Sequence, residues 1–380
     1  MILERLRLAA FRCHRRANVL FAPGVTVLVG PNGAGKTSVL EAAHFLFRGA
    51  SPRTATPRDL VTRGESVLRV EGDLRDSAGR HITAAVGWSV SGERRLTAAG
   101  SPLASVARWE GVMPVRMFLP DDLRLVKGSP RRRRAYMDQL APLVDPAYRE
   151  ALARYDEALQ QRNALLRQGV VGADHAPWEA LLAREGRRLV SSRARLLAAL
   201  APPYAQAHGR LAPVPTDPVG LTYRTNAADL DEEAYRERLA EQRVADRRRT
   251  FTHVGPHRDD IRLTLGGRDL REFGSQGEQR TALLALLVAE RERARGEGGD
   301  PPLLLLDDVM SELDPTRRRA LMRILLAGGQ SIITTTDLHY FTSEELAMIE
   351  VVRLREDVDP PDMAPRGFTA RRDQEEGGAR

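Results

Sequence analysis

Almost wholly apolar runs mark the strands that we expect at the centre of the fold. Val25–Val29 and Leu303–Leu306 are runs of this kind, which are typical of parallel strands covered on both faces. A third strand is expected at Ser331–Thr335. A helix is expected over residues 36–47, directly after the first run, and another over Pro315–Leu326, between the other two strands. This order predicts an α/β fold.

Helical periodicity dominates the middle of the chain. Leucine and alanine recur there at helical spacing, and Ser129 with Pro130 forms an N-cap and N1 pair that opens the first segment. We expect helices over residues 131–140, 146–168, 176–200 and 231–249. Prolines are expected to interrupt the chain between the last two, at Pro202, Pro203, Pro213, Pro215 and Pro218. The pieces are too short for the sustained heptads of a long coiled coil, so we expect a compact helical lobe.

A phosphate-binding pattern lies between the first predicted strand and the first predicted helix. It reads Gly30, Pro31, Asn32, Gly33, Ala34, Gly35, Lys36 and Thr37, the full G-x-x-x-x-G-K-T pattern. Glycines let backbone N–H groups curl around a polyphosphate, and the helix N-terminus adds unpaired donors. We expect these residues and Ser38 to bind the nucleotide, with Lys36 on the β- and γ-phosphates and Thr37 on Mg²⁺. The strand–loop–helix context disfavours the alternative of a plain glycine turn.

Two carboxylates follow the second apolar run. Asp307 and Asp308 stand at the C-terminal end of a predicted parallel strand, where ligands bind in open α/β sheets. Asp307 is expected to hold Mg²⁺, and Asp308 to act as the general base toward the attacking water. A buried strand that ends in a helix cap is the alternative. The phosphate loop in the same chain favours the catalytic interpretation, with Lys36 and Asp308 as the catalytic residues.

A small, glycine-containing turn opens the helical run that precedes this strand. Such a turn at a helix start is a second candidate anion site, and residues 311–314 follow the two carboxylates. In this order the segments resemble the ABC ATPase head. The resemblance implies a signature motif at Ser275, Gln276, Gly277 and Gln279, and a D-loop with Asp314. In that architecture the signature of one subunit touches the ATP of the other, which implies an ATP-dependent homodimer.

The long interval between the phosphate loop and the signature splits the predicted head. The fold class expected is an ABC-type, SMC-like P-loop ATPase head with an inserted α-helical lobe. Residues 1–125 are expected to form the N-terminal part of the head and residues 126–250 the arm lobe. Residues 251–356 complete the head, and residues 357–380, rich in proline, glycine and charge, form a tail expected to be disordered.

The charge of the chain favours a polyanionic partner. The net charge is +7, and 58 basic residues include only two lysines, Lys36 and Lys127; nucleic acid is expected before membrane, although arginine bias without meaning stays open. Aromatic residues are only 5% of the chain, so contact with a duplex backbone is expected rather than base readout or stacking. The densest run, Arg131, Arg132, Arg133 and Arg134, opposes a helix dipole; phosphate contact and a solvated helix start are equal alternatives.

The compartment expected is the cytoplasm. One cysteine, Cys13, excludes an internal disulfide and fits a reducing environment. The N-terminus has no apolar core of a signal peptide, and the longest apolar stretches are too short to span a bilayer. No membrane partner is therefore expected.

Several segments are similar to the RecF family, the bacterial recombination-repair ATPases related to the SMC proteins. They are residues 6–12, 38–42, 51–54 and 59–65 and, most specifically, residues 118–130 with Arg133 and Arg134, and residues 254–260. The resemblance implies an ATP-dependent protein that binds duplex and gapped DNA without sequence preference. It also implies recombinational repair after DNA damage, replication-gap processing, dimerisation on DNA, RecA loading with RecO and RecR, and slow, DNA-stimulated hydrolysis of ATP.

Departures from the ATPase pattern leave alternatives to weigh. Asp308 stands where transporter ATPases have glutamate, residues 334–337 contain no switch histidine, and no glutamine between Ser101 and Asp138 can be assigned to a Q-loop. Another SMC-like ATPase that bridges DNA would need a much longer heptad arm. A transporter ATPase subunit would need the missing motifs and a less basic surface, and a binding module with a relic site would not need all four catalytic and metal-binding side chains.

Other polar residues near these motifs have less specific roles. Arg12 and Arg53 are further candidates for contact with the nucleotide. His257 is expected to be satisfied by local hydrogen bonds, with a report on the nucleotide state as the alternative. His339 is expected to be a surface residue at a helix start. Arg258 is expected to form an ion pair with one of the two aspartates that follow it.

Overall fold

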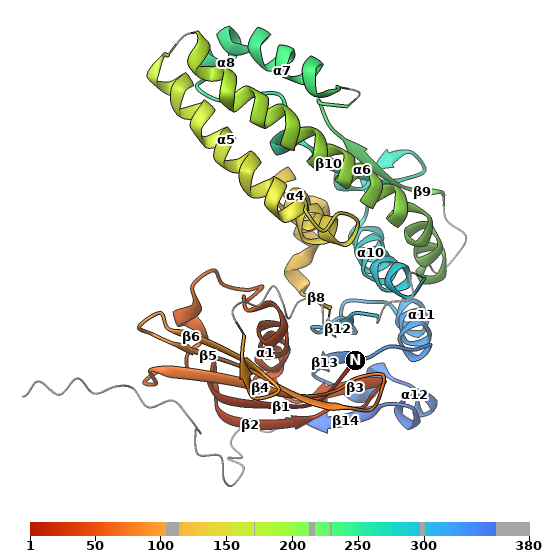
Figure 1. The fold of residues 1–380 in the computed structure, drawn as a ribbon. Coiled ribbons are helices and arrows are strands. Elements are labelled where there is room, and N and C mark those ends of the chain that lie inside the picture. Colours follow the sequence, from red (N-terminus) through yellow and green to blue (C-terminus); the bar gives the residue numbers. More distant parts are fainter. Residues whose placement is uncertain (104–113, 171, 213–216, 229, 297–300, 355–380) are drawn as a thin grey trace, which may run out of the picture.

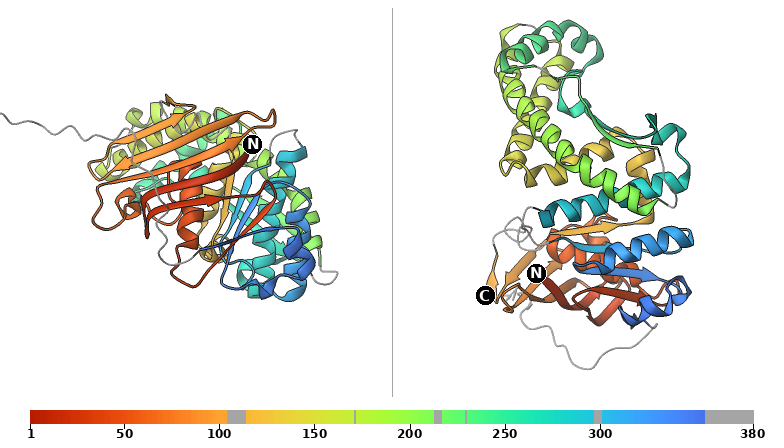
Figure 2. Two further views of the ribbon diagram at one scale, coloured as in Figure 1. Left: turned by 90° about the horizontal axis from the view of Figure 1, so that it is seen from below. Right: turned by 90° about the vertical axis from the view of Figure 1, so that its right-hand side faces the viewer.

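The computed structural model describes residues 1–103, 114–170, 172–212, 217–228, 230–296 and 301–354. The predicted tail at residues 357–380 lies outside the described residues. Figures 1 and 2 show a lower body that contains two sheets, and an upper body of helices stacked over it. Within the described ranges, no helix is both long and apolar enough to cross a membrane.

A five-stranded parallel sheet forms the centre of the lower body. Its order is β14-β3-β13-β12-β8, with β3 (Val25–Val29), β8 (Val115–Phe118), β12 (Leu303–Leu306), β13 (Ser331–Thr335) and β14 (Glu350–Arg353). All residues of β3, β12 and β13 are buried, because helices or a second sheet cover both faces. The three predicted strands, at β3, β12 and β13, are confirmed with their bounds.

A six-stranded antiparallel sheet covers one side of the parallel sheet, with helix α1 (Lys36–Arg48) buried in the core between the two. Its order is β2-β1-β4-β5-β6-β7, with β1 (Ile2–Phe11), β2 (His14–Leu20), β4 (Val67–Arg75), β5 (His81–Ser89), β6 (Arg94–Ala98) and β7 (Ser101–Pro102). Burial alternates along β4, as expected where only one face meets a core.

The upper body consists of helices and a small sheet. Its helices are α4 (Pro130–Leu140), α5 (Tyr148–Gln168), α6 (Ala176–Leu211), α7 (Glu232–Glu241) and α8 (Arg243–Arg249). The small sheet has the order β11-β10-β9, with β9 (Val219–Arg224), β10 (Asp260–Leu265) and β11 (Arg268–Asp269). β9 pairs with β10 across the arm boundary predicted at residue 250, and the domain bounds stay a prediction.

Helices α10 (Gln276–Gly296) and α11 (Pro315–Leu326) cover the face of the parallel sheet opposite α1, and α10 also packs on α6. The remaining elements are short. They are α3 (Arg124–Lys127), α9 (Leu270–Phe273) and α12 (Ser343–Ala347), with 3₁₀ turns at Pro57–Leu60, Pro120–Leu123, Ala141–Leu143, Ala173–His175, Pro256–Arg258 and Leu338–Tyr340.

Two expectations about the middle helices are wrong. Helix α6 continues through Pro202 and Pro203 to Leu211, although each proline removes one backbone hydrogen bond and costs roughly 3 kcal/mol in a helix interior. The buried stripe of α6 continues on both sides of the prolines, at Leu196, Leu200, Tyr204, Ala207 and Leu211, and its packing outweighs that cost. The single helix expected over residues 231–249 is divided into α7 and α8 at Gln242.

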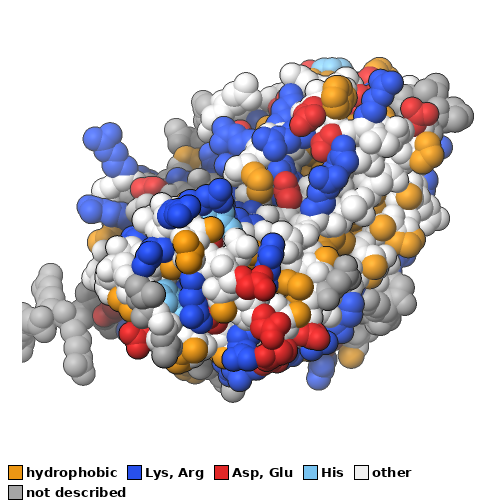
Figure 3. All heavy atoms as spheres, turned by 90° about the horizontal axis from the view of Figure 1, so that it is seen from above, with side chains coloured by type: hydrophobic (Ala, Val, Ile, Leu, Met, Phe, Trp, Pro, Cys, Tyr) orange, Lys and Arg blue, Asp and Glu red, His pale blue; other side chains and the backbone are white. Residues whose placement is uncertain are grey.

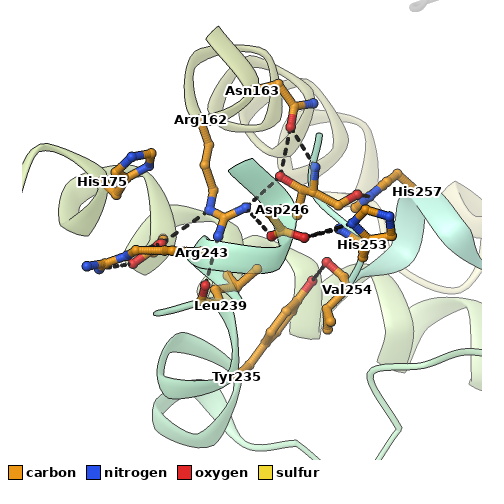
Figure 4. A network of polar contacts seen from close by, with 12 residues as sticks. Arg162, Asn163, His175, Tyr235, Leu239, Arg243, Asp246, His253, Val254 and His257 are labelled. Carbon is orange, nitrogen blue, oxygen red and sulfur yellow. Dashed lines mark hydrogen bonds and ion pairs between the residues drawn. The ribbon is translucent and has the colours of Figure 1, made fainter. Parts of the chain in front are cut away.

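A buried arginine joins four segments at the far end of the upper body (Figure 4). The side chain of Arg162 on α5 is 0% exposed. It donates to Glu179 of α6 at 3.2 Å, to Asp246 of α8 at 2.7 Å and to the Thr252 hydroxyl at 2.8 Å. It also donates to the carbonyl of Leu239 at 2.8 Å. A fully buried charge is tolerated because these acceptors surround it.

We expect Arg162→Met to destabilise the protein by about 3–5 kcal/mol, because it removes the buried guanidinium from two buried carboxylates, which then keep, among the described residues, only Arg243 and His253 at the edge of the network. Urea unfolding followed by circular dichroism measures the change. Arg154→Met on the same helix is the control, because Arg154 is half exposed and pairs with the exposed Glu150, a kind of ion pair that contributes no more than about 1 kcal/mol. Arg154 also lies 3.6 Å from Glu185, but Arg184 holds that carboxylate at 3.0 Å. Equal stability of the two variants would contradict a structural role for Arg162.

Candidate nucleotide-binding site

The phosphate loop connects β3 to the buried helix α1. Gly33 has φ 90 and Gly35 has φ 81, the left-handed conformation that glycine adopts at low cost. Gly35 is the N-cap of α1. A side chain at Gly35 would collide with Cys13 and His14, which pack on the loop from the turn between β1 and β2. The glycine is therefore required by conformation and by space.

Lys36 lies inside the loop. Its ammonium donates to the carbonyls of Gly30 at 2.7 Å and Pro31 at 2.8 Å. Burial lowers the pKa of Lys36, while the nearby carboxylates of Asp308 and Asp307 act in the opposite direction. An ammonium has three donors, so one remains for a phosphate oxygen even while both carbonyl contacts are kept.

Thr37 and Asp307 are brought into direct contact from two distant parts of the chain. The Thr37 hydroxyl lies 2.9 Å and 3.0 Å from the two carboxylate oxygens of Asp307. These oxygens suit Mg²⁺, which takes few protein ligands and completes its shell with phosphates and water. In the described part of the chain, no group of three or more His, Cys, Asp or Glu is placed to hold a metal ion. The hydroxyl and carboxylate oxygens of this pair fit an Mg²⁺ ion whose other ligands are phosphate oxygens and water.

Asp308 combines an unusual backbone with a free acceptor. Its φ of 46 lies in the left-handed region, where residues other than glycine are strained. Its carboxylate oxygen Oδ1 is buried and has no hydrogen-bond partner among the described residues. An unsatisfied buried acceptor is costly, and a water molecule or another proton donor would satisfy it. The geometry suits the predicted role of general base, which stays a prediction.

The predicted signature residues divide into an exposed and a buried set. Ser275 and Gln276 are exposed, and Ser275 exchanges hydrogen bonds with Glu278 in a capping arrangement at the start of α10. Gln279 is only 1% exposed, and its amide donates to the carbonyls of Leu270 at 2.7 Å and Gly274 at 3.0 Å. The Gln279 side chain thus braces the turn from inside, and we no longer expect it to touch a partner's phosphate.

Gly277 and Asp314 lie on either side of a contact between the signature helix and the predicted D-loop. A side chain at Gly277 would meet the guanidinium of Arg317 at 3.5 Å. Asp314 caps α11 by accepting from the Arg317 N–H at 3.0 Å, and Arg317 donates to the Thr281 hydroxyl at 2.8 Å. The two motifs are thereby held together. No hydrogen bond or ion pair among the described residues joins them to the phosphate loop of the same chain.

The arginine run at the start of α4 is only partly available to a ligand. Arg133 is 3% exposed and donates to both carboxylate oxygens of Asp260, at 2.5 Å and 2.9 Å. Arg134 donates to the carbonyl of Asp259 at 2.9 Å. The expected phosphate contact is therefore withdrawn for Arg133, because its guanidinium is already engaged inside the protein. Arg131 and Arg132 are exposed and Arg134 is partly exposed, and for these three residues the contact stays a prediction.

The 254–260 segment is tied to the upper body. His257 lies between the Tyr155 hydroxyl at 2.7 Å and the Thr252 carbonyl at 2.8 Å, and burial lowers its pKa to about 4. Its expected local role is confirmed. The ion pair expected for Arg258 is wrong, because Arg133 and Arg193 hold the two aspartates. Arg258 instead lies over the ring of Phe251, 4.6 Å from its centroid.

Two groups of site residues were not recognised from the sequence. Glu41 of α1 is fully buried and pairs with Arg12 at 2.6 Å and Arg53 at 3.1 Å, so both arginines brace the helix that follows the phosphate loop. A glutamate on an otherwise apolar helix face was the signal. Thr334 contacts Asp307 and the backbone of Asp308; the sequence marked residues 334–337 only for the missing switch histidine, and a run of threonines at a strand end gave no signal for this contact. His339 is exposed at a 3₁₀ turn, as expected.

One family model matches the N-terminal part of the chain, and two relatives match nearly all of it. Residues 5–85 match the model of the AAA domain. The DNA replication and repair protein RecF of Symbiobacterium thermophilum is 40% identical over 347 residues, which cover 89% of this chain and 92% of the relative. The protein of the same name from Heliobacterium modesticaldum is 38% identical, with 93% of this chain and 98% of the relative covered.

Solved structures agree with the fold. The structure of the recombination mediator protein RecF with ATP in the RecFOR pathway has a TM-score of 0.79 and 31% identity, and the match covers 88% of this chain and 92% of that one. The SMC head bound to the winged-helix domain of ScpA has a TM-score of 0.57 at 15% identity, over 93% of this chain and 95% of that one. The predicted ABC-type, SMC-like α/β fold is confirmed.

We expect Lys36→Met to weaken nucleotide binding by at least about 10-fold, because the loop loses charged hydrogen bonds to phosphate. Calorimetric titration with a non-hydrolysable ATP analogue measures the affinity. Lys127→Met is the matched control, since it removes the only other lysine, which is exposed on α3. Unchanged affinity in the Lys36 variant would contradict the assignment of the phosphate loop.

Proposed function

The chain belongs to the RecF family of DNA replication and repair proteins, and from this we propose that it is an ATP-dependent DNA-binding ATPase of recombinational repair and replication-gap processing. The observation that carries the proposal is the contact between Thr37 and Asp307. It joins the two residue types that hold Mg²⁺ in P-loop ATPases at the carboxyl edge of a parallel sheet. The AAA-domain match at residues 5–85 supports ATP as the nucleotide.

The site residues have complementary roles in hydrolysis. Lys36 binds the β- and γ-phosphates together with the backbone donors of the loop, and Thr37 and Asp307 bind Mg²⁺. When bound, the ion would offset charge on the phosphate oxygens. Asp308 accepts a proton from water as the water oxygen bonds to the γ-phosphorus and the bond to the bridging oxygen of ADP breaks. Aspartate reaches less far than glutamate, which fits slow turnover that resets a switch.

The exposed part of the signature supports a dimer that forms around ATP. Ser275 and Gln276 face solvent at the N-terminus of α10, where free backbone donors favour an anion. One protomer would present this turn to the ATP of its partner. Hydrolysis would then remove the group that joins the two protomers, so ATP binding favours the dimer and hydrolysis releases it.

DNA is the proposed polyanionic partner, contacted through its backbone. The net charge of +7 supports it. On the face seen from above the helical body, Lys and Arg side chains are interspersed with Asp and Glu (Figure 3), so that face is not uniformly basic. Duplex and gapped DNA bound without sequence preference, RecA loading with RecO and RecR, and stimulation of hydrolysis by DNA follow from family membership and belong to the proposal.

One experiment tests the proposal as a whole. DNA binding is measured at matched salt without nucleotide, with ADP, with ATP and with a non-hydrolysable analogue, and the oligomeric state is measured in each condition. We expect the ATP state to be dimeric and to bind DNA with the steepest salt dependence, because a dimer neutralises more phosphates. DNA binding that is the same in all four conditions would overturn it.

We expect Asp308→Asn to bind ATP normally and to hydrolyse it about 100-fold more slowly or worse, because the amide cannot accept the proton. An ATP-bound dimer should accumulate, which light scattering detects. Asp76→Asn, in the turn between β4 and β5, is the control. Hydrolysis at the normal rate would show that Asp308 is not the base.

We expect Ser275→Arg to keep ATP binding and to lose ATP-dependent dimerisation, because a bulky side chain would stand where the partner's nucleotide must approach. Analytical ultracentrifugation with and without ATP measures this. Glu272→Arg adds a cation at an exposed position of α9 nearby and serves as the control. Wild-type dimers in the Ser275 variant would rule out a signature that acts on the partner's ATP.

A further inference from the structure

A buried threonine connects the two carboxylates of the candidate site. Thr334 lies on β13, and its side chain is 0% exposed. Its hydroxyl donates to Oδ1 of Asp307 at 2.7 Å and accepts from the backbone N–H of Asp308 at 2.9 Å. An ionised carboxylate can only accept and an amide N–H can only donate, so both bonds together fix the direction of the hydroxyl proton.

The bond to the Asp308 N–H holds a strained backbone in place. A φ of 46 at Asp308 costs an aspartate roughly 1 kcal/mol or more, and the structure must supply contacts that keep it. Thr334 holds the N–H, and the Ser311 hydroxyl donates to the Asp308 carbonyl at 2.9 Å. The carboxylate itself has a buried oxygen without a partner. Its direction is therefore set largely through the backbone.

The hydroxyl of Thr37 is the other one that contacts Asp307, and its role differs from that of the Thr334 hydroxyl. Thr37 also contacts Asp307, but that contact would change if Thr37 and Asp307 took Mg²⁺. Thr334 stands on the sheet side, in the strand between β3 and β12, and bonds both aspartates. It is the only hydroxyl among the described residues for which hydrogen bonds to both of them are found.

We propose that Thr334 is a positioning residue for hydrolysis, whose hydroxyl fixes Asp308 relative to Asp307. This inference rests on the proposed function, because it needs Asp308 as the base and Asp307 as a metal ligand. Thr334 touches neither reactant in this role. It acts through the backbone of Asp308, so its loss should slow the chemical step and leave nucleotide binding intact. If Thr334 only filled space, loss of its hydroxyl would change neither the chemical step nor nucleotide binding.

The test compares one variant that loses the hydroxyl at constant size with one that keeps the hydroxyl and loses the methyl group. Thr334→Val removes the hydroxyl and keeps the shape, whereas Thr334→Ser keeps the hydroxyl. Thr26→Val is the matched control, because Thr26 is equally buried in the same sheet and its hydroxyl accepts from Ala22 at 2.9 Å, away from the site. Steady-state ATP hydrolysis gives kcat and KM, titration with a non-hydrolysable ATP analogue gives affinity, and thermal unfolding reports on the fold.

We expect kcat to fall about 10- to 100-fold in Thr334→Val, the range typical for residues that orient a metal ligand or catalytic group. KM and affinity for the analogue should stay close to those of Thr26→Val, and Thr334→Ser should hydrolyse nearly as the wild type does. In the Asp308→Asn background, Thr334→Val should add no further loss, because residues that act through one another are not additive.

Three outcomes would overturn the inference alone. They are a kcat of Thr334→Val equal to that of Thr26→Val, an equal loss of analogue binding and hydrolysis in Thr334→Val, and additive losses in the double variant. A wild-type chain that binds the analogue without hydrolysing ATP would overturn the proposed function, and the inference with it. Wild-type hydrolysis therefore separates the two failures.

Discussion

The contact between Thr37 and Asp307 is the constraint around which the chain is organised. These residues lie 270 positions apart, and they meet because β3, β13 and β12 are parallel neighbours whose carboxyl ends share one edge of the sheet. The intervening chain must therefore leave the lower body and return to it. Strands β4 to β7 of the antiparallel sheet, the upper body and α10 all lie within this interval, and none of them separates the two residues.

Side chains with obvious chemistry were predictable, and those that position them were not. Lys36, Thr37, Asp307 and Asp308 could be identified because a glycine loop and an apolar strand are local patterns. Thr334 contacts Asp307 and Asp308, which lie 27 and 26 positions away in the sequence, so no local pattern reveals its role. Gln279 contacts carbonyls only nine and five positions away, but the sequence does not show that its side chain turns inward. Likewise, β3 and β12 were predictable as apolar runs, and β13 was expected from its place after them. By contrast, β8, β14 and most of the antiparallel sheet, with its many arginines on the solvent side, were not recognised.

Formal charge is a poor guide to the surface of this protein. Arg133, Arg162 and Arg193 are buried against carboxylates and carbonyls, so part of the arginine content serves the interior. A count made from the sequence treats these residues as surface cations, because the sequence does not distinguish a buried guanidinium from an exposed one. Buried arginines therefore stabilise the upper body, whereas other, exposed arginines are available to attract a polyanion.

The polar network around Arg162 also limits how this architecture could be lengthened. Helices α5 and α6 form an antiparallel pair, and the end at which α5 leads into α6 is the natural place to insert further turns in both helices. Here α7 and α8 fold over that end, and Arg162 binds groups from α6, α8 and the segment that follows (Figure 4). Any turn added to the two helices at this end would move Arg162 away from its acceptors. A longer arm could thus evolve only after this cap was lost or rebuilt.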